Sequence, residues 1–335
     1  MLNTAPYRTV LKPYGQALVE LARKRPEVLC LSADLSRQCE VDLFQEQIPD
    51  RFLLTGMAEA HMMGMAGSLA REGFIPFVHT FGVFATRRPL DQIANAIAYP
   101  DLPVKIIGFM PGISSPGGPS HQAIDDVALM RALPNMTVID VADATEIGQV
   151  VEEVADIPGP VYLRLKRGEI PVIFDESHRF SVDRAQLLQE GSDVTLVTNG
   201  MMLASCIAAA RTLEDAGISA AVVNVPVIKP IDTATIAEQI SRSGAVIAVE
   251  NHSIIGGLGS AVAEIIAERG LAATLRRVGL DDCFAEGSKS APFLFEKYGL
   301  STQRIIDEAW GLVGRAGSAP LAAAPDLDAG EYAPV

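Results

Sequence analysis

The sequence lacks the features that mark membrane, secreted and metal-binding proteins. No apolar run approaches the ~20 residues that a membrane-spanning helix requires, so no membrane is expected as a partner. Residues 1–12 contain no basic segment followed by an apolar stretch, which argues against a signal peptide. The four cysteines have no C-x-x-C spacing: Cys30, Cys39, Cys206 and Cys283. This pattern disfavours a metal site and favours a reducing, cytoplasmic setting.

Positive charge is also scarce. The 335 residues include 27 lysines and arginines against 41 aspartates and glutamates, for a net charge of −14. Such a chain is poorly suited to the phosphates of nucleic acids, so no nucleic acid is expected as a partner. Apolar residues make up 49% of the chain, which is ample for buried cores, and its length suggests about two domains.

Short apolar runs alternate with helical patterns along residues 1–170. Strands are expected at Val28–Ala33, Ile75–His79, Val104–Phe109, Thr137–Val141 and Val161–Leu165. Helices are expected at Tyr14–Lys24, Ala58–Arg71, Phe84–Tyr99, Ile124–Ala132 and Ala144–Ala155. Because the apolar residues are continuous rather than alternating, the strands should be buried on both faces. The pattern predicts an α/β domain with a mostly parallel sheet and helices on both faces.

The alternation restarts after residues 171–190, which read as a linker with one edge segment. A second, smaller α/β domain is expected over residues 191–315. Its strands are predicted at Val194–Thr198, Ala220–Val225, Ala245–Glu250 and Thr274–Val278, and its helices at Met201–Asp215, Thr233–Arg242, Gly257–Arg269 and Ser301–Leu312. Residues 316–335 are rich in alanine, proline and glycine, and we expect a mobile tail.

Glu59 lies near the start of an apolar helical segment. The spacing leaves two alternatives open: an exposed first turn stabilised by the helix dipole, or burial at an interface. Burial disfavours the carboxylate anion, so a buried Glu59 could share a proton with a ring nitrogen of a ligand.

Three further residues stand near loops that a ligand could approach. His121 follows the Gly117–Pro119 loop, whose backbone is accessible. Phe81 and Phe84 stand where a strand gives way to a helix, and their spacing fits either core packing or stacking on a planar ring.

Two other features carry weaker signals. Arg164 ends a predicted strand, where open α/β sheets bind ligands, and either an anion or a salt bridge would satisfy it. Gly256–Gly259 precedes a helix as a dinucleotide-binding loop would, but it lacks the full G-x-G-x-x-G register. A tight turn is the favoured interpretation of these glycines.

Taken in order, these segments resemble the C-terminal half of transketolase over most of the chain, in particular the separate C-terminal subunit of a split transketolase. The matching segments are Ser32–Leu35, Glu59, Thr80–Phe84, His121, Arg164 and Glu250–Gly257. The resemblance implies a pyrimidine-binding domain for thiamine diphosphate, followed by the family's C-terminal domain.

The resemblance also implies roles for individual residues. The cofactor-binding residues would be Asp34, Leu35, Glu59, Phe81 and Phe84, with Glu59 donating a hydrogen bond to the aminopyrimidine ring. His121 would be a second catalytic residue, handling protons on the sugar hydroxyls. The substrate-binding residues would be His79, Arg87, His121 and Arg164.

The family binds the cofactor diphosphate through a metal ion and a Gly-Asp-Gly segment, which this sequence does not contain. The resemblance therefore implies an N-terminal partner subunit that supplies the diphosphate site with Mg or Ca. It also implies a dimer of this chain, hence an α2β2 assembly, with the apolar Met57–Leu69 helix as an interface. The implied reaction is transfer of a two-carbon ketol unit from a ketose to an aldose, with a sugar or sugar phosphate as substrate.

The chain departs from the family at the substrate side. An aspartate of the family loop is Gly117, and a phosphate-contacting histidine is Phe109. An arginine expected near the first helix falls close to Leu11, an aromatic is replaced by Arg87, and a small residue by His79. These changes spare the cofactor side, so the substrate is expected to differ from an ordinary pentose phosphate.

Three alternatives remain open. The chain could be the β subunit of another thiamine diphosphate enzyme, either a 2-oxoacid dehydrogenase or one similar to deoxyxylulose-phosphate synthase. It could be a non-catalytic partner subunit, against which the retention of Glu59, Phe81, Phe84 and His121 argues. A dinucleotide oxidoreductase would depend on Gly256–Gly259 alone.

Overall fold

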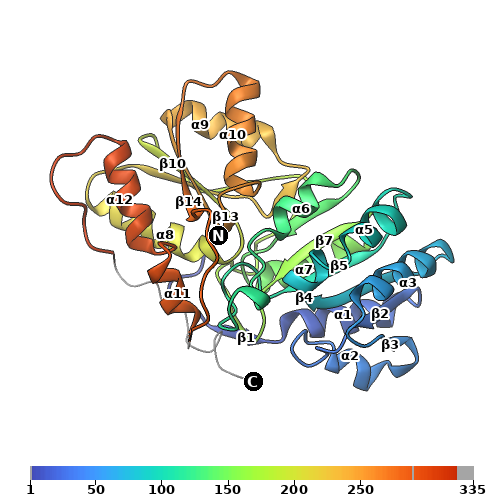
Figure 1. The fold of residues 1–335 in the computed structure, drawn as a ribbon. Helices are drawn as coiled ribbons and strands as arrows, with labels where there is room; N and C mark the ends of the chain where they lie inside the picture. Colours follow the sequence, from blue (N-terminus) through green and yellow to red (C-terminus); the bar gives the residue numbers. More distant parts are fainter. Residues whose placement is uncertain (1, 289, 323–335) are drawn as a thin grey trace.

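The computed structural model describes residues 2–288 and 290–322, and these residues form two large sheets, each flanked by helices, and a two-stranded ribbon (Figure 1). The larger sheet has the strand order β12 (Val227–Lys229), β6 (Thr137–Asp140), β7 (Val161–Leu165), β5 (Lys105–Phe109), β4 (Ile75–Phe81), β2 (Val28–Ser32) and β3 (Phe52–Leu54). All of these strands run parallel except β12, which pairs antiparallel with β6. The mostly parallel sheet predicted from the continuous apolar runs is confirmed.

Helices cover both faces of this sheet, which explains why its strands are apolar throughout. One face packs against α1 (Pro13–Lys24), α2 (Asp42–Gln47) and α7 (Ala144–Asp156). The other face packs against α3 (Glu59–Arg71), α6 (Asp126–Ala132) and the π-helix Ile93–Ala98. Successive residues of one strand alternate between the two cores: Cys30 faces the first, and Leu29 and Leu31 face the second.

The helix predicted at Phe84–Tyr99 is broken. The structure has α4 (Gly82–Thr86), then α5 (Leu90–Gln92), and then the π-helix. Pro89 stands at the break, and its ring cannot continue the hydrogen-bond ladder of a helix. The π-helix lies close to α3, since a Cβ on Gly67 would meet the Ala96 carbonyl oxygen. The break leaves the segment after Thr86 at the carboxyl edge of the sheet.

The smaller sheet has the order β14 (Thr274–Leu280), β13 (Ala245–Ser253), β10 (Val194–Thr198), β11 (Ala220–Asn224) and β9 (Gln186–Gln189). Only β9 runs antiparallel to its neighbour in this sheet. Helices α8 (Leu203–Asp215), α11 (Ala291–Lys297) and α12 (Thr302–Leu312) cover one face, and α9 (Thr233–Ser243) and α10 (Leu258–Arg269) cover the other. The second α/β unit predicted from the sequence is confirmed.

The two units share more of the chain than the sequence indicated. Strand β12 follows β11 in the chain yet extends the larger sheet. A two-stranded ribbon pairs β1 (Thr9–Leu11) with β8 (Glu169–Pro171). At the C-terminus, Ala322 N donates to Gln303 Oε1 on α12, so the described start of the expected tail packs against that helix. Residues 323–335 of that tail lie outside the described residues.

A buried arginine joins the two units. The side chain of Arg164, on β7, is 1% exposed. Its Nε and Nη2 donate to Asp126 at 2.7 and 3.0 Å, and its Nη1 donates to Asp140 at 2.6 Å. Nη2 also reaches the carbonyl oxygen of Asn251 on β13, 3.2 Å away. One cation therefore ties α6, β6 and β7 of the first unit to β13 of the second.

The two carboxyls of this cluster respond differently to the same arginine. Burial acts to raise the pKa of Asp126, but the charge of Arg164, aided by that of His252 and by hydrogen bonds from Arg164 and Tyr162, outweighs burial and holds the pKa below its usual range. Burial raises the pKa of Asp140 above its usual range, although Arg164 opposes this. Asp126 is thus the more tightly paired carboxylate.

Within the described part of the chain, no helix has both the length and the apolar character that crossing a bilayer would require.

We predict that Arg164→Met lowers the free energy of unfolding by about 3–5 kcal/mol, because it leaves two buried carboxylates without their cation. The loss should be largest near neutral pH. Without the cation, both carboxyls bind protons more readily in the folded state, so the difference from the wild type should shrink as the pH falls toward about 4. Urea denaturation followed by circular dichroism over this pH range measures both effects.

Arg242→Met is the matched control, because its guanidinium is 51% exposed and pairs with Glu238 on the surface of α9. Exposed pairs contribute only about 0.2–1 kcal/mol. Equal losses in the two variants, or a deficit of Arg164→Met that is independent of pH, would contradict the assignment of a buried ionic joint.

Candidate functional site

The predicted site residues gather at the carboxyl edge of the larger sheet. Asp34 and Leu35 follow β2, Phe81 ends β4, and the loop that carries His121 follows β5. Glu59 begins α3, just after β3. Because all these strands are parallel, residues that are distant in the sequence meet at one edge, which is where open α/β sheets bind ligands. These segments thus lie along one edge of the sheet, and their joint role as a binding site stays a prediction.

Glu59 is buried although it occupies the first turn of its helix. Its side chain is 4% exposed, and its Oε1 accepts a hydrogen bond from Arg88 Nη1 at 2.8 Å. Gly56, with a φ of +77°, turns the chain between β3 and α3. The sequence left open an exposed first turn or burial. The structure places Glu59 in the first turn of α3, near the helix dipole, and also shields its carboxyl from solvent.

Phe81, Phe84 and His121 form an aromatic cluster. The two phenylalanine rings are nearly parallel, with centroids 6.1 Å apart and an interplanar angle of 17°. The imidazole of His121 meets Phe84 edge-on at 5.3 Å and Phe81 at 6.4 Å. Phe84 is half-buried, and His121 is also partly exposed. The cluster therefore presents flat apolar faces with a titratable group at their margin.

Arg88 was missed by the sequence reasoning. Its guanidinium carbon lies 4.2 Å from the ring centre of Phe84, and the same group donates to Glu59. The available signal was the Arg87-Arg88 pair, which begins three residues after Phe84 and is followed by a helix-breaking Pro89.

The second unit holds the loop that carries His121. Asn251 on β13 accepts from the amide of Ile113 at 3.0 Å and donates to the carbonyl of Pro111 at 3.0 Å. Further along, Ser288 N donates to the Pro116 carbonyl at 3.0 Å. Gly118 has a φ of +78° and packs against Gly287. The loop is thus anchored at several points to a unit that contributes no predicted catalytic residue.

His79 does not face the site, in contrast to the prediction that it binds substrate. It is fully buried, with Nε2 2.6 Å from the Tyr14 hydroxyl and Nδ1 2.9 Å from the Leu31 carbonyl. Because a carbonyl only accepts, Nδ1 carries the proton and Nε2 accepts from tyrosine. Burial lowers the pKa of His79 to about 4, so the ring is neutral at pH 7. Tyr14 also packs edge-on against Phe109. His79 and Phe109, two positions at which the chain departs from the family, therefore belong to one buried cluster.

Arg164 likewise does not reach the site, in contrast to its predicted role with a substrate anion. All its guanidinium nitrogens are taken by partners from its own chain, as described above. The next arginine, Arg167, lies just beyond the end of β7 and is half-buried near Cys39 and Glu40. Within the described residues its guanidinium has no hydrogen-bond partner. Burial lowers the pKa of Arg167, because the charged guanidinium is poorly solvated there. A bound anion would stabilise that charge.

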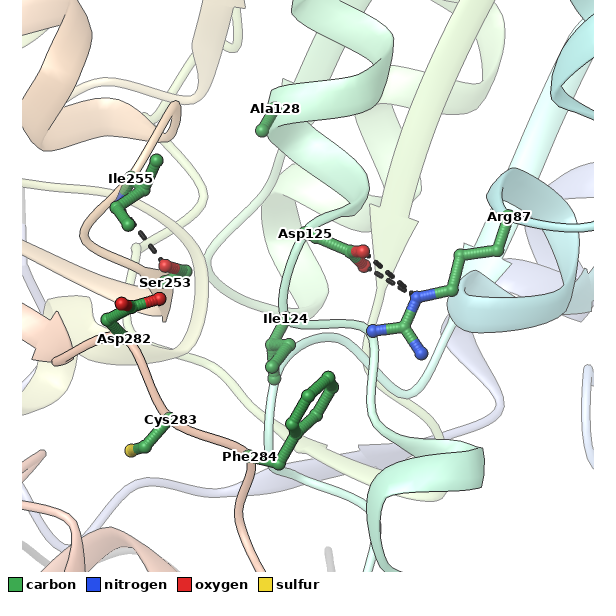
Figure 2. Close-up of a pocket in the computed structure, with 9 residues that line it drawn as sticks. All are labelled: Arg87, Ile124, Asp125, Ala128, Ser253, Ile255, Asp282, Cys283 and Phe284. Carbon is green, nitrogen blue, oxygen red and sulfur yellow. Dashed lines mark hydrogen bonds and ion pairs between the residues drawn. The ribbon is translucent and has the colours of Figure 1, made fainter.

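Arg87 lines a cavity of about 280 Å³ between the two units (Figure 2). Its Nε donates to both oxygens of Asp125, at 2.9 and 3.0 Å, which leaves its terminal nitrogens available. Figure 2 shows Arg87 and Asp125 on one side of the cavity and the segment Asp282–Phe284 on the other. Arg87 therefore presents its terminal nitrogens to this cavity, and its role in binding substrate stays a prediction.

The remaining predicted residues are placed as follows. Asp34 is exposed, and Leu35 is half-buried against the first core. The glycines at 256–259 do not form a phosphate cradle, because the Glu250 carboxylate accepts from the amides of Leu258 and Gly259 at 2.7 and 2.8 Å. An anion of the chain itself occupies the start of α10, which removes the basis of the dinucleotide alternative. No group of three or more metal-ligating side chains is found among the described residues.

The comparisons with known proteins agree with this geometry. The family model "Transketolase, pyrimidine binding domain" matches residues 7–172, and "Transketolase, C-terminal domain" matches residues 183–305. An uncharacterized transketolase family protein of Sinorhizobium fredii is 44% identical over 297 residues, covering 88% of this chain and 86% of that protein. A 6-deoxy-6-sulfo-D-fructose transketolase subunit of a Clostridium species is 40% identical over 297 residues, covering 88% and 92%.

Solved structures give the same result. A split-gene transketolase, described as an inactive β4 tetramer, aligns with a TM-score of 0.84 at 42% identity, covering 91% of this chain and 98% of that one. Transketolase from Campylobacter jejuni aligns with a TM-score of 0.76 at 23% identity and supports the fold alone; this chain covers 46% of it. The two domain matches and these relatives lead to one conclusion: the chain belongs to the transketolase family and contains its pyrimidine-binding and C-terminal domains.

Proposed function

We propose that this chain, with an N-terminal subunit, transfers a two-carbon ketol unit from a ketose to an aldose. One observation carries the proposal: a carboxyl that is 4% exposed, Glu59, is joined through the Arg88 guanidinium to the ring of Phe84, which stacks on Phe81 at the carboxyl edge of a parallel sheet. The family is thiamine diphosphate dependent, and this arrangement suits the pyrimidine half of that cofactor.

The residues at this edge of the sheet suit a pyrimidine ring. A planar heterocycle needs a flat apolar surface and a group that exchanges a proton with a ring nitrogen. Phe84 offers the surface, and Glu59 offers the proton-exchanging group next to it. The sequence contains no Gly-Asp-Gly segment for the diphosphate. The proposal therefore assigns the diphosphate and its metal, Mg²⁺ or Ca²⁺, to the partner subunit.

In the proposed mechanism the cofactor, when bound, supplies a carbon nucleophile that stabilises the two-carbon fragment. Glu59 holds the pyrimidine by a hydrogen bond to its ring nitrogen and moves the proton at that atom. His121 handles protons on the sugar hydroxyls, and its edge contact with Phe84 fixes the ring at the margin of the site. The loop anchored by Asn251 keeps this imidazole in position.

The residues expected on the substrate side of the site are not placed as the family resemblance implied. Phe109 and His79 are buried against Tyr14, so they offer no polar group to a substrate. Arg167 replaces Arg164 in our proposal as the arginine that meets an anionic group, and Arg87 is a second positive charge at the site. A relative is described as acting on a sulfonated sugar. We therefore propose an anionic sugar, phosphorylated or sulfonated, as the substrate class.

The assembly is part of the proposal. Two copies of this chain would meet through their larger domains, with two partner subunits around them. Met57 is 77% exposed and Leu54 is 60% exposed next to α3, which provides apolar surface for such a contact. The neighbour described as an inactive β4 tetramer supports a requirement for a partner. The four free thiols support a cytoplasmic location.

A second candidate function is favoured by one observation. A 1-deoxy-D-xylulose-5-phosphate synthase of Desulfitobacterium hafniense is 32% identical over 304 residues, although this chain spans 48% of that protein. Such an enzyme would use a 2-oxoacid donor and release carbon dioxide, whereas ketol transfer releases an aldose and no gas. The reaction products therefore separate the two functions.

The reconstituted pair of subunits should transfer a ketol unit to an aldehyde acceptor in the presence of thiamine diphosphate and Mg²⁺. Neither subunit alone should do so, because each holds only half of the cofactor site. Chromatographic analysis of products from xylulose 5-phosphate or a sulfonated ketose, with ribose 5-phosphate or glycolaldehyde as acceptor, measures the reaction. Release of carbon dioxide from pyruvate without ketol transfer would favour the second candidate instead.

Glu59→Gln should lower kcat of the reconstituted enzyme by about 10²–10⁴-fold, because an amide cannot exchange a proton with the ring nitrogen. The fold should persist, since the substitution keeps the size and the hydrogen-bonding capacity of the side chain. Steady-state kinetics and thermal unfolding measure the two properties. Glu72→Gln, at the exposed end of the same helix, is the matched control and should retain activity. A kcat within about twofold of the wild type for Glu59→Gln would exclude the proposed role.

Arg167→Ala should raise KM for an anionic acceptor by about 10–100-fold with little change in kcat, because a charged hydrogen bond contributes about 1.5–3 kcal/mol. The KM for glycolaldehyde, a neutral acceptor, should stay constant. Arg184→Ala, an exposed arginine of the segment between the domains, serves as the control. If KM rises equally for both acceptors, Arg167 has a structural role, and Arg87 becomes the candidate for the anion site.

A further inference from the structure

Arg88 makes two contacts that no role assigned so far explains. It lies in the break between α4 and α5, and its side chain is 54% exposed. The guanidinium nevertheless turns inward, donates from Nη1 to Glu59 Oε1 at 2.8 Å, and places its carbon 4.2 Å from the ring centre of Phe84. A half-exposed arginine has many solvated alternatives, so this orientation depends on the two contacts themselves.

These contacts are the ones that the proposed function requires of the aminopyrimidine. A guanidinium is planar, carries N–H donors and packs on aromatic faces. It therefore satisfies the surface of Phe84 and an oxygen of Glu59 in the way a planar nitrogen heterocycle would. With Arg88 in this position the Glu59 side chain is 4% exposed, whereas Arg88 itself is 54% exposed. A ring that packs on this face of Phe84 and reaches Glu59 must displace Arg88.

We propose that Arg88 occupies the place of the aminopyrimidine in the isolated subunit and must swing out before thiamine diphosphate binds. This inference rests on the proposed function. Arg88 is thus a gating residue that competes with the cofactor for Glu59 and Phe84. In the isolated chain it compensates a buried carboxyl and covers an aromatic face that would otherwise lie open.

The local structure allows the swing without disturbing the core. Arg88 lies outside the regular turns of α4 and α5, and its side chain already borders solvent. Its neighbour Arg87 is held by Asp125, so the backbone on that side is fixed while the Arg88 side chain turns. The next residue, Pro89, is buried and fixes the other side. Only the rotamers of one flexible side chain need to change.

The test uses the reconstituted complex and the dissociation constant of thiamine diphosphate with Mg²⁺, measured by titration calorimetry, with association rates from stopped-flow fluorescence. Arg88→Ala should bind the cofactor about threefold to tenfold more tightly and faster, because no arginine side chain then competes with the cofactor for Glu59 and Phe84. Arg71→Ala, exposed at the end of α3, is the control and should bind like the wild type.

A double-mutant cycle separates gating from a structural role. In the Glu59→Gln background the contact is already weakened, so adding Arg88→Ala should change the dissociation constant by less than twofold. Weaker binding by Arg88→Ala would overturn the proposal, because it would mean that arginine supports the bound cofactor. A structure of the complex with Arg88 still on Glu59 beside bound thiamine diphosphate would overturn it as well.

The failure of this inference is distinguishable from failure of the proposed function. If wild-type complex binds thiamine diphosphate and Glu59→Gln weakens that binding, the function stands, and an unchanged Arg88→Ala variant removes the gate alone. If the wild-type complex binds no thiamine diphosphate, both proposals fall together.

Discussion

The buried cation of Arg164 is the constraint on which the rest of the structure depends. Desolvating a guanidinium is costly, and the cost is offset only if every nitrogen finds a partner of good geometry. Asp126, Asp140 and the carbonyl of Asn251 supply those partners from three different elements. Each element must therefore be in place before the arginine is stable inside. Asp126 opens α6 just after the loop that carries His121, so the same ion cluster fixes where that loop ends.

This arrangement gives the second domain a role that its lack of catalytic residues would not indicate. The end of β13 places Asn251 against the beginning of the loop, and the segment near Gly287 packs on its turn at Gly118. The loop is thus held between two sheets, although the aromatic residues that its imidazole touches belong to one of them. Loss of the second domain would remove these anchors, together with the Asn251 carbonyl that Arg164 requires. In this chain the second domain supports the loop that carries His121.

The parallel sheets could be predicted from the sequence because continuous apolar runs have one common explanation, burial on both faces. Residue roles were harder, since an arginine in an apolar strand fits both an anion site and a buried pair. The decisive partners of Arg164 lie 24 and 38 residues away, and no spacing rule connects them. The position of His79 on β4 was equally hard to predict, because its hydroxyl partner is Tyr14 on helix α1, 65 residues away. The break at Pro89 could have been foreseen, and with it the unusual position of Arg88.

The contrast between the two sides of the site suggests how specificity is divided. The residues expected next to the cofactor keep the chemical types that the family uses, and Glu59 with Phe84 already holds a planar cation in the isolated chain. On the substrate side, Phe109 and the neutral His79 are buried in the core, where both contact Tyr14. Core packing cannot be adjusted for a new substrate without loss of stability. Under the proposed function, discrimination therefore falls to Arg167 and the terminal nitrogens of Arg87, or to the partner subunit. Because so few groups of this chain are left for a sugar, the proposed function makes the partner subunit the place where substrate preference is set.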